Sequence, residues 1–332
     1  MSTSSTPNEA GHVPLEAQVG GHKGVMTTED GSLLIKPALP VEVAFYQSVG
    51  TDPAFAPLRP FIPKFYGTLT LEGMVDPEKG LDGGEVKPIP GQDKDTIVLE
   101  NLSHSFKKPN ILDIKLGTVL YDVDATPEKK ARMEKTARET TSLSTGIRLT
   151  GFQVYDLAAN LAVNTPREYG KSIKASELID GIGRFFPVAS SSSSPQPASL
   201  PSSGTGLPAR LLLPILEYLR EDIAEIREAI ADVHMRMVGG SLLIIYEADW
   251  ERVEEGLKYL DEDGGSDEDE EDDDDDKEAK QRPGPPYAVK VIDFAHTRIV
   301  PGEGPDEGVL KGVDTTLSLL DQRIKQVKAA AA

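Results

Sequence analysis

The sequence contains no cysteine, which excludes disulfide bonds and thiolate metal sites and suits an intracellular protein. It also has no apolar run of the length that a membrane-spanning helix needs, so we expect no transmembrane segment. The first residues, Met1 to His12, are polar and rich in serine and threonine. Because no apolar stretch occurs there, we expect no secretory signal peptide.

Three motifs of common phosphate-transferring enzymes are also missing. The sequence has neither the His-Arg-Asp catalytic loop nor the Asp-Phe-Gly motif of protein kinases. It has no Gly-x-x-x-x-Gly-Lys-Ser/Thr motif, which forms the phosphate-binding loop of many nucleotide hydrolases. Protein-kinase activity is therefore disfavoured, and we expect no P-loop nucleotide site.

Negative charge is abundant but unevenly distributed. The formal charge is −20, and the segment Asp261 to Asp276 holds 13 acidic and no basic residues. Without that segment the formal charge would be −7, so the rest of the chain is only mildly acidic. Local basic clusters can still bind a polyanionic ligand there. We expect no direct binding of nucleic acid.

The segment Pro109 to Gly117 is typical of a mostly apolar strand that carries two opposite charges. Side chains alternate along a strand, so Asp113 and Lys115 share one face while Ile114 and Leu116 pack on the other. A carboxylate and an ammonium on one wall can hold a ligand with hydroxyls and phosphates. The alternative is an exposed ion pair that contributes little free energy, and the spacing alone favours it.

The same segment carries a family signature. It matches the pattern Pro-x-x-x-Asp-x-Lys-x-Gly of the inositol polyphosphate kinases at every fixed position. Two further marks of that family follow in the expected order, Ser241-Leu242-Leu243 and Ile292-Asp293-Phe294. The chain therefore resembles this family from about Gln18 to Leu320, and within it the fungal multikinases most.

The resemblance implies an α+β fold with two kinase-like lobes. We expect a small antiparallel sheet in an N-lobe at residues 16–101, on the nucleotide side. A larger α+β C-lobe at residues 102–332 would hold the inositol phosphate site. We expect residues 1–15 to be disordered, and the Ser/Pro/Gly-rich and acidic tracts at 189–207 and 261–285 to be low-complexity insertions.

Hydrophobic patterning predicts the main elements. Strands are expected on both sides of a turn at Glu29-Asp30-Gly31, the first from Gln18 to Met26, and at Phe61–Leu71, Thr96–Glu100, Pro109–Gly117, Leu120–Asp122, Gly146–Tyr155, Ser241–Tyr246 and Tyr287–Phe294. Helices are expected after Pro40, after a Thr126 N-cap with Pro127 at the first position, from a first turn holding Pro214 to Gly239, and at Thr315–Lys328.

Lys36 and Glu42 are candidates for the nucleotide side. Lys36 ends an apolar strand, and Glu42 lies in the helix expected after Pro40. In kinases such a lysine, paired with a helix glutamate, binds the α- and β-phosphates. An unpaired surface lysine is the alternative; the resemblance favours the functional interpretation for Lys36 and leaves both open for Glu42. It also places a hinge at Glu100 and Leu102 that would bind adenine.

Asp293 lies near the end of the apolar run Val289 to Phe294. A carboxylate in such a run is seldom buried without a partner, and a metal ion is one candidate. A helix cap or a hydrogen-bonded structural aspartate is the alternative. The resemblance matches Asp293 to the metal aspartate of the family. It would hold Mg²⁺, with Ser241 as a second candidate ligand.

The resemblance implies transfer of the ATP γ-phosphoryl group to a hydroxyl of an inositol polyphosphate. Asp113 would contact the ribose of ATP, and Lys115 the acceptor and the transferred phosphate. Lys129 and Arg132 share a helix face, and with His296 they would orient the acceptor; a merely solvated charged helix is the alternative. No general base is identified, and Asp113 stays open for that role.

The multikinase branch implies phosphorylation of the trisphosphate and tetrakisphosphate towards the pentakisphosphate. A hexakisphosphate kinase or a trisphosphate 3-kinase of the same fold is the alternative. An alternative of another class is a nuclear scaffold whose acidic tract binds transcription regulators. We expect a monomer in the nucleus and cytoplasm. The order of the phosphorylated hydroxyls, and whether phosphoinositide lipids are substrates, stay open.

Overall fold

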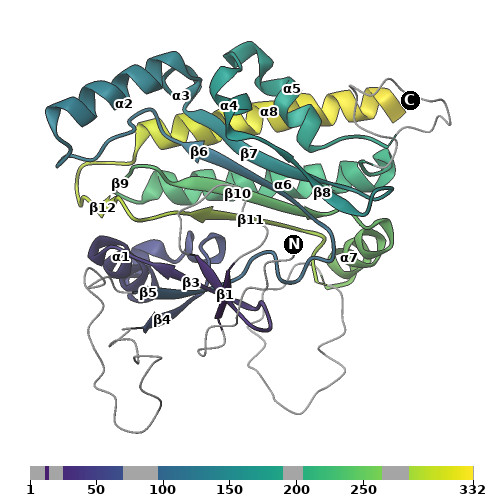
Figure 1. Ribbon diagram of the computed structural model, residues 1–332, viewed down its shortest axis with the longest axis horizontal. Coiled ribbons are helices and arrows are strands. Elements are labelled where there is room, and N and C mark those ends of the chain that lie inside the picture. The colour runs from purple at the N-terminus through teal and green to yellow at the C-terminus, as the bar shows by residue number, and fades with distance from the viewer. Residues whose placement is uncertain (1–11, 15–24, 70–95, 190–204, 264–283, 332) are drawn as a thin grey trace, which may run out of the picture.

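The computed structural model describes residues 12–14, 25–69, 96–189, 205–263 and 284–331. In these ranges it combines two five-stranded antiparallel sheets, a two-stranded sheet and helices. This mixed architecture confirms the expected α+β fold (Figure 1). Among the described residues, no helix has both the length and the apolar character needed to span a membrane.

The first sheet is built from the N-terminal part of the chain. Its strand order is β1-β2-β3-β5-β4. The bounds are β1 His12–Pro14, β2 Met26–Thr28, β3 Leu33–Pro37, β4 Phe65–Leu69 and β5 Thr96–Glu100. The turn between β2 and β3 has Gly31 at φ +76°, a conformation that suits glycine, and confirms the predicted hairpin. Helix α1, Pro40–Thr51, follows β3 as predicted.

The second sheet has the signature strand at its centre. Its order is β11-β10-β6-β7-β8. The bounds are β6 Pro109–Leu116, β7 Ile147–Asp156, β8 Leu161–Thr165, β10 Ser241–Glu247 and β11 Tyr287–Ile292. Ile114, Leu242 and Val291 lie opposite one another on these strands and are fully buried. The apolar face of a sheet must be covered by another layer of secondary structure.

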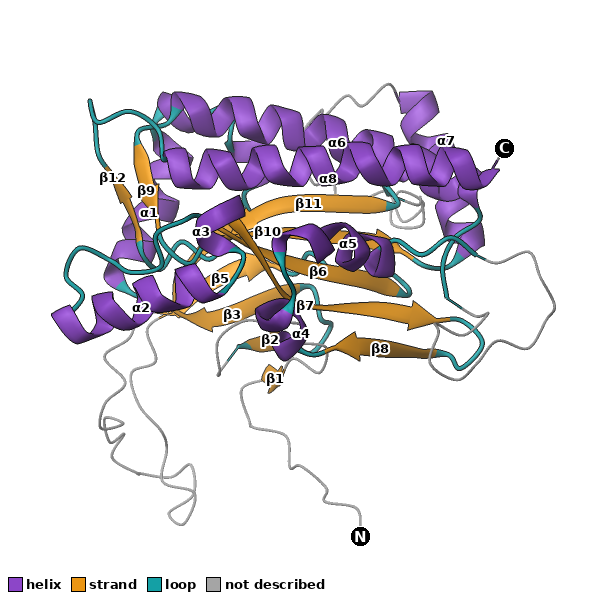
Figure 2. Ribbon diagram, turned by 90° about the horizontal axis from the view of Figure 1, so that it is seen from above, coloured by secondary structure: helices purple, strands orange, loops and turns teal. Residues whose placement is uncertain are grey.

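Helices α6, Ala209–Asp232, and α8, Glu307–Ala331, supply that layer. They lie side by side along the sheet in both ribbon views (Figures 1 and 2), while the first sheet and α1 lie on its other side (Figure 1). The remaining helices are α2 Pro127–Glu139, α3 Ser142–Thr145, α4 Arg167–Ser172, α5 Leu178–Phe185 and α7 Trp250–Asp263. The short 3₁₀ helices are η1 Pro53–Phe55, η2 Arg59–Phe61 and η3 Ala175–Glu177.

The long helix differs from its prediction at both ends. Pro208 is the N-cap of α6, so Pro214 lies inside the helix and not in its first turn. The helix ends at Asp232, and Met237, predicted to be helical, belongs to strand β9, Met235–Met237. The reason is a distant partner: β9 pairs with β12, Thr297–Ile299, in a separate two-stranded sheet.

Two further predictions were wrong. The stretch Leu120–Asp122 forms no strand; it is part of the irregular connection between β6 and α2. Helix α8 begins at Glu307, eight residues before the predicted Thr315, and includes Gly308 and Gly312. These glycines allow a close approach, because a Cβ on Gly312 would lie 2.4 Å from the carbonyl oxygen of Gly146.

The expected insertions lie mostly outside the described residues, as does most of the strand expected from Gln18 to Met26. Where their edges are described, they are folded. Leu207 is fully buried, and its N–H donates to the carbonyl of Pro187 over 3.2 Å. Asp261 to Asp263 form the end of helix α7, which the sequence did not predict. The insertion boundaries at 207 and 261 therefore need correction; the lobe boundary at 101 stays a prediction.

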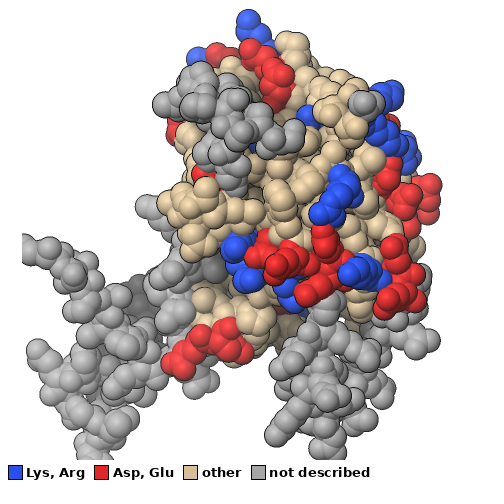
Figure 3. All heavy atoms as spheres, turned by 90° about the vertical axis from the view of Figure 1, so that its right-hand side faces the viewer, with Lys and Arg blue, Asp and Glu red and all other residues tan. Residues whose placement is uncertain are grey.

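Charged side chains around α7 are interleaved by sign. On the face shown in Figure 3, acidic and basic side chains lie next to one another. Arg210 pairs with Glu254 at 2.7 Å, and Lys108 pairs with Asp249 at 3.0 Å. Part of the negative charge around α7 is therefore neutralised by neighbouring basic side chains.

Candidate functional site

A cluster of two lysines and two carboxylates joins the two large sheets. Lys36, on β3, donates to Glu42 on α1 over 2.9 Å and to Asp293 Oδ1 over 3.1 Å. Lys115, on β6, donates to Asp293 Oδ2 over 2.9 Å. Asp293 directly follows β11, so β6 and the end of β11 in the second sheet meet β3 and α1 at this cluster. The pairing of Lys36 with Glu42 excludes the alternative of an unpaired surface lysine, and Glu42 is almost completely buried.

The charges of the cluster hold one another in the ionised state. Burial alone would raise the pKa of Asp293, but the positive charges and hydrogen bonds of Lys115 and Lys36 outweigh it and lower the pKa to about 2. Burial likewise opposes the charge of Lys36, whereas Asp293 and Glu42 raise the pKa of Lys36 above its usual value. At neutral pH Lys36 and Asp293 are therefore both charged.

The backbone of Asp293 is strained. Its φ is +67°, in the left-handed region that non-glycine residues seldom adopt. Such a conformation costs about 1–3 kcal/mol and persists only where the surroundings enforce it. Here the strain directs the carboxylate towards both lysines, which is a feature typical of functional sites.

Ser241 and Lys115 lie opposite each other on β10 and β6. The Lys115 ammonium donates to Ser241 Oγ over 2.6 Å and to the carbonyl of Gly239 over 2.9 Å. Ser241 also pairs with Ile292, the residue before Asp293. The structure thus brings the predicted residues Ser241, Lys115 and Asp293 together.

Asp113 lies beside this cluster and is 2% exposed. Its Oδ2 is 3.9 Å from the ammonium of Lys115, and its Oδ1 is buried without a hydrogen-bond partner. The alternative of an exposed surface pair is therefore wrong. A buried carboxylate oxygen without a donor is unfavourable, so Oδ1 is a ready acceptor for a hydroxyl of a ligand.

Unpartnered buried atoms concentrate around the cluster. Among the described residues, four buried side-chain atoms have no hydrogen-bond partner: Glu42 Oε2, Asp113 Oδ1, Arg148 Nε and Thr297 Oγ1. Glu42 is the partner of Lys36, Arg148 lies opposite Lys115, and Thr297 starts β12 soon after Asp293. Buried polar groups in native proteins usually have partners, so this concentration indicates a ligand site.

The residues expected to orient the acceptor are more exposed. Lys129 and Arg132 lie on the solvent side of α2, without an ion pair among the described residues. His296 Nδ1 lies 3.4 Å from Asp122 Oδ2, and Arg298 Nε lies 3.5 Å from Asp122 Oδ1. Helix α2, β12 and α1 lie at the same end of the molecule (Figures 1 and 2). That Lys129, Arg132 and His296 orient an acceptor stays a prediction.

Glu100 and Leu102, the expected hinge residues, line a cavity of about 700 Å³. This segment is hydrogen-bonded on both sides: Glu100 accepts from the N–H of Lys64, and the Asn101 amide donates to the carbonyl of Gly31. The cavity also touches Lys290, three residues before Asp293, but not the lysine–aspartate cluster itself. A contact of Glu100 and Leu102 with adenine therefore stays a prediction.

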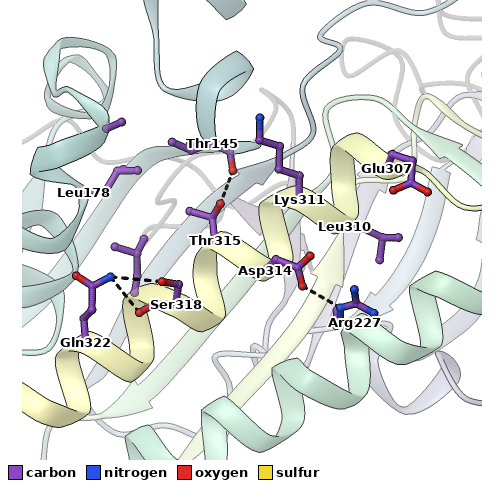
Figure 4. A pocket seen from close by; sticks show the side chains of 12 residues that line it. Thr145, Leu178, Arg227, Glu307, Leu310, Lys311, Asp314, Thr315, Ser318 and Gln322 are labelled. Atoms are coloured by element: carbon purple, nitrogen blue, oxygen red, sulfur yellow. Dashed lines mark hydrogen bonds and ion pairs between the residues drawn. The ribbon is translucent and has the colours of Figure 1, made fainter.

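A second cavity, of about 520 Å³, lies beside α6 and α8, away from these residues. Figure 4 shows Arg227 and Asp314 pointing towards each other from the two helices, at 2.8 Å. The hydroxyl of Thr315 donates to the carbonyl of Thr145 over 2.6 Å. Because these polar groups already have partners, the cavity is a weaker candidate than the cluster.

Comparison with known proteins decides the family. The sequence model described as inositol polyphosphate kinase matches residues 96–321, more than half of the chain. The chain belongs to the inositol polyphosphate kinase family. It is 32% identical to the inositol polyphosphate multikinase of Saccharomyces cerevisiae, over 92% of this chain and 96% of that protein. The resemblance drawn from three motifs is confirmed.

Other relatives agree. The kinase is 29% identical to the multikinase of Schizosaccharomyces pombe, over 69% of this chain and 77% of that protein. It is also 29% identical to mouse inositol hexakisphosphate kinase 3, over 68% of this chain and 50% of that protein. The solved structure of the S. cerevisiae multikinase with ADP and Mn²⁺ is similar at a TM-score of 0.62 and 27% identity, over 89% of this chain and 100% of that one. The kinase-like fold and ATP-dependent kinase activity follow from these likenesses.

The residues of the kinase fit a metal ion shared with a nucleotide. No group of three or more histidine and carboxylate side chains that could hold a metal by themselves occurs in the described ranges. Mg²⁺ in nucleotide enzymes needs only one or two carboxylates, because phosphates and water supply the other ligands. The ionised Asp293, with the hydroxyl of Ser241 close to the same cluster, provides such a partial set.

Arg148 and Asp122 are the site residues that the sequence did not predict. Arg148 lies in a strand that was predicted, but only the pairing of β7 with β6 places it opposite Lys115. Its charge between the apolar residues Ile147 and Leu149 was the available signal. Asp122 was assigned to a strand, and no local pattern connects it with His296 and Arg298.

Proposed function

We propose that this kinase is a multikinase, which transfers the γ-phosphoryl group of ATP to inositol trisphosphate and tetrakisphosphate and proceeds towards the pentakisphosphate. The observation that carries the proposal is the partly buried Lys36–Asp293–Lys115 cluster across the two sheets. The identity to the S. cerevisiae multikinase over nearly the whole chain supports the choice of branch.

The nucleotide would bind along the cluster from the side of the first sheet. Lys36, oriented by Glu42, would neutralise the inner phosphates. The unpartnered Oδ1 of Asp113 would accept a hydrogen bond from a ribose hydroxyl. The hinge at Glu100 and Leu102 would offer backbone groups to adenine.

Mg²⁺ would be held by Asp293, with Ser241 as a further ligand. A bound divalent ion neutralises the charge that is distributed over the phosphate oxygens. The Mn²⁺ in the structure of the S. cerevisiae multikinase supports a divalent metal in the family. The depressed pKa of Asp293 keeps its carboxylate ionised for this role.

Lys115 would contact both the transferred phosphoryl group and the acceptor, because it lies on the central strand within hydrogen-bond distance of Asp293. A positioned cation stabilises the charge of the transition state in a site that excludes water. Lys129, Arg132 and His296 would orient the acceptor. Asp113 stays the candidate for a general base.

The test is product analysis with separate inositol phosphates. The protein is incubated with ATP, Mg²⁺ and each of the tris-, tetrakis- and hexakisphosphates, and the products are separated by chromatography. We expect the trisphosphate to pass through the tetrakisphosphate to the pentakisphosphate. Accumulation of the tetrakisphosphate would instead identify a trisphosphate 3-kinase, and consumption of the hexakisphosphate alone would identify a hexakisphosphate kinase.

A second proposed role concerns the acidic tract. Its 13 carboxylates within Asp261 to Asp276 favour binding to basic segments of transcription regulators, and we propose a monomer that acts in nucleus and cytoplasm. A chain without residues 264–276 should keep its kinase turnover and lose binding to such a regulator in the nucleus. Lys115→Ala should show the opposite pattern. Equal binding by both variants would refute the role of the tract.

A further inference from the structure

We infer that Arg148 binds a phosphate group of the inositol polyphosphate acceptor. The inference rests on the proposed function and adds a binding residue to it. Arg148 is the second residue of β7 and lies opposite Lys115 on β6, which in turn lies opposite Ser241 on β10. Opposite residues of paired strands share a face. Arg148, Lys115 and Ser241 therefore form one polar row across three strands.

The guanidinium of Arg148 has no anionic partner in the described parts of the chain. Its Nε is buried without a hydrogen bond, and no ion pair of Arg148 occurs there. Lys36 and Lys115 differ, because both pair with Asp293. Burial lowers the pKa of Arg148, and the charge of nearby Asp113 offsets this only in part. An arginine nevertheless stays protonated, so a partly desolvated cation lies beside Asp113.

Asp113 does not satisfy Arg148. No hydrogen bond joins the two side chains, and Asp113 Oδ1 and Arg148 Nε are both buried without partners. The acceptor oxygen of Asp113 and the donor N–H of Arg148 are therefore both free to bind a ligand. A hydroxyl would suit the carboxylate oxygen, whereas a phosphate would suit the guanidinium, which can bind it through two parallel N–H groups.

The chain path places Arg148 on the acceptor side of Lys115. The chain leaves β6 after Leu116, forms α2 and α3, and returns at Ile147. Lys115 and Arg148 therefore flank the excursion that carries Lys129 and Arg132. Lys36 and Asp293, the residues proposed for the inner phosphates and the metal ion, pair with each other, and Asp293 also pairs with Lys115. Neither forms an ion pair with Arg148 in the described residues, whose nearest charge is that of Asp113. A phosphate at Arg148 thus belongs to the acceptor and not to ATP.

The test compares Arg148→Ala and Arg148→Lys with the wild type. Steady-state kinetics give kcat and the KM values for inositol trisphosphate and ATP, and calorimetry measures trisphosphate binding without nucleotide. We expect Arg148→Ala to raise the KM and the Kd for trisphosphate about tenfold to a hundredfold, the range of one hydrogen-bonded charge contact. The KM for ATP should stay within about twofold. Arg148→Lys should recover only part of the affinity, because it keeps the charge and loses the planar fork.

The matched control is Arg220→Ala, which removes an arginine of α6 that pairs with Asp321 at 3.1 Å. It should leave every kinetic constant unchanged. An unchanged trisphosphate affinity in Arg148→Ala, or a loss of ATP affinity alone, would overturn the inference. If Arg148→Ala does not fold, the soluble Arg148→Lys decides: wild-type trisphosphate affinity overturns the inference. Wild-type protein without turnover of any inositol phosphate would instead contradict the proposed function.

Discussion

Lys36 donates a hydrogen bond to Asp293 Oδ1 over 3.1 Å, although 257 residues separate them in the chain. Lys36 belongs to the first sheet, and Asp293 follows the edge strand of the second. Their contact therefore fixes how the two sheets face each other across the site. Because each charge stabilises the other, the same pair that orders the sheets keeps the site ionised for phosphoryl transfer.

Replacing Asp293 by asparagine should remove turnover while the fold survives. Asparagine has nearly the same shape and tolerates the left-handed φ of +67°, and Lys36 keeps Glu42 as a partner. We expect kcat to fall about a hundredfold or more, because the carboxylate charge is lost from the proposed metal site. Turnover is measured at saturating Mg²⁺, with circular dichroism as the check on folding. Wild-type activity under these conditions would refute the metal assignment.

Lys115→Ala and Asp113→Ala should differ in which substrate they affect. Without Lys115, binding of an ATP analogue should stay nearly intact while kcat for the inositol phosphate falls, since the lysine acts on charge that grows in the transition state. Without Asp113, nucleotide binding should weaken and acceptor affinity should change less. If Asp113 were the general base, nucleotide affinity would hold and only kcat would fall. Unchanged turnover in both variants would contradict the kinase site.

Asp222 should make stability depend on pH. Burial of Asp222 on α6 is the main reason that its pKa is raised from 3.8 to about 6. The hydrogen bond with Tyr287 lowers the pKa but does not outweigh burial. A carboxyl group that binds its proton more tightly in the folded state favours folding below about pH 4, and this contribution is lost as pH rises through about 6. We expect Asp222→Asn to have a higher Tm than the wild type at pH 7, with a smaller difference at pH 4. Parallel curves of Tm against pH would contradict this.

Gly312→Ala should destabilise the protein through a close backbone contact. The added Cβ would lie 2.4 Å from the carbonyl oxygen of Gly146, so α8 or its neighbour must move. Such overpacking costs about 1–3 kcal/mol and should lower Tm by several degrees. Gly50→Ala in α1 is the control, because nothing lies within 4 Å of its added Cβ. It should keep or raise Tm; a fall as large as that of Gly312→Ala would show that the contact is not the cause.

The sequence by itself determined the elements whose signals are local. The turn at Gly31, the Thr126 N-cap and the apolar strands at 96–100, 109–116 and 241–247 all follow from neighbouring residues. The pairing of Lys36 with Glu42 was suggested by the kinase pattern of a strand lysine and a helix glutamate, and the two residues lie only six positions apart. The three family motifs also needed only short stretches of sequence.

Only the tertiary structure decided which residues meet across strands and helices. The local pattern predicts a helix at Met237, but this residue lies in a strand because it pairs with Thr297 of β12. Gly312 lies inside α8, where the backbone of Gly146 packs against it. The position of Arg148 opposite Lys115 depends on the register of β6 and β7, with its shift between Leu112 and Ile114. Register is set by packing between segments far apart in the chain, so a local pattern cannot specify it.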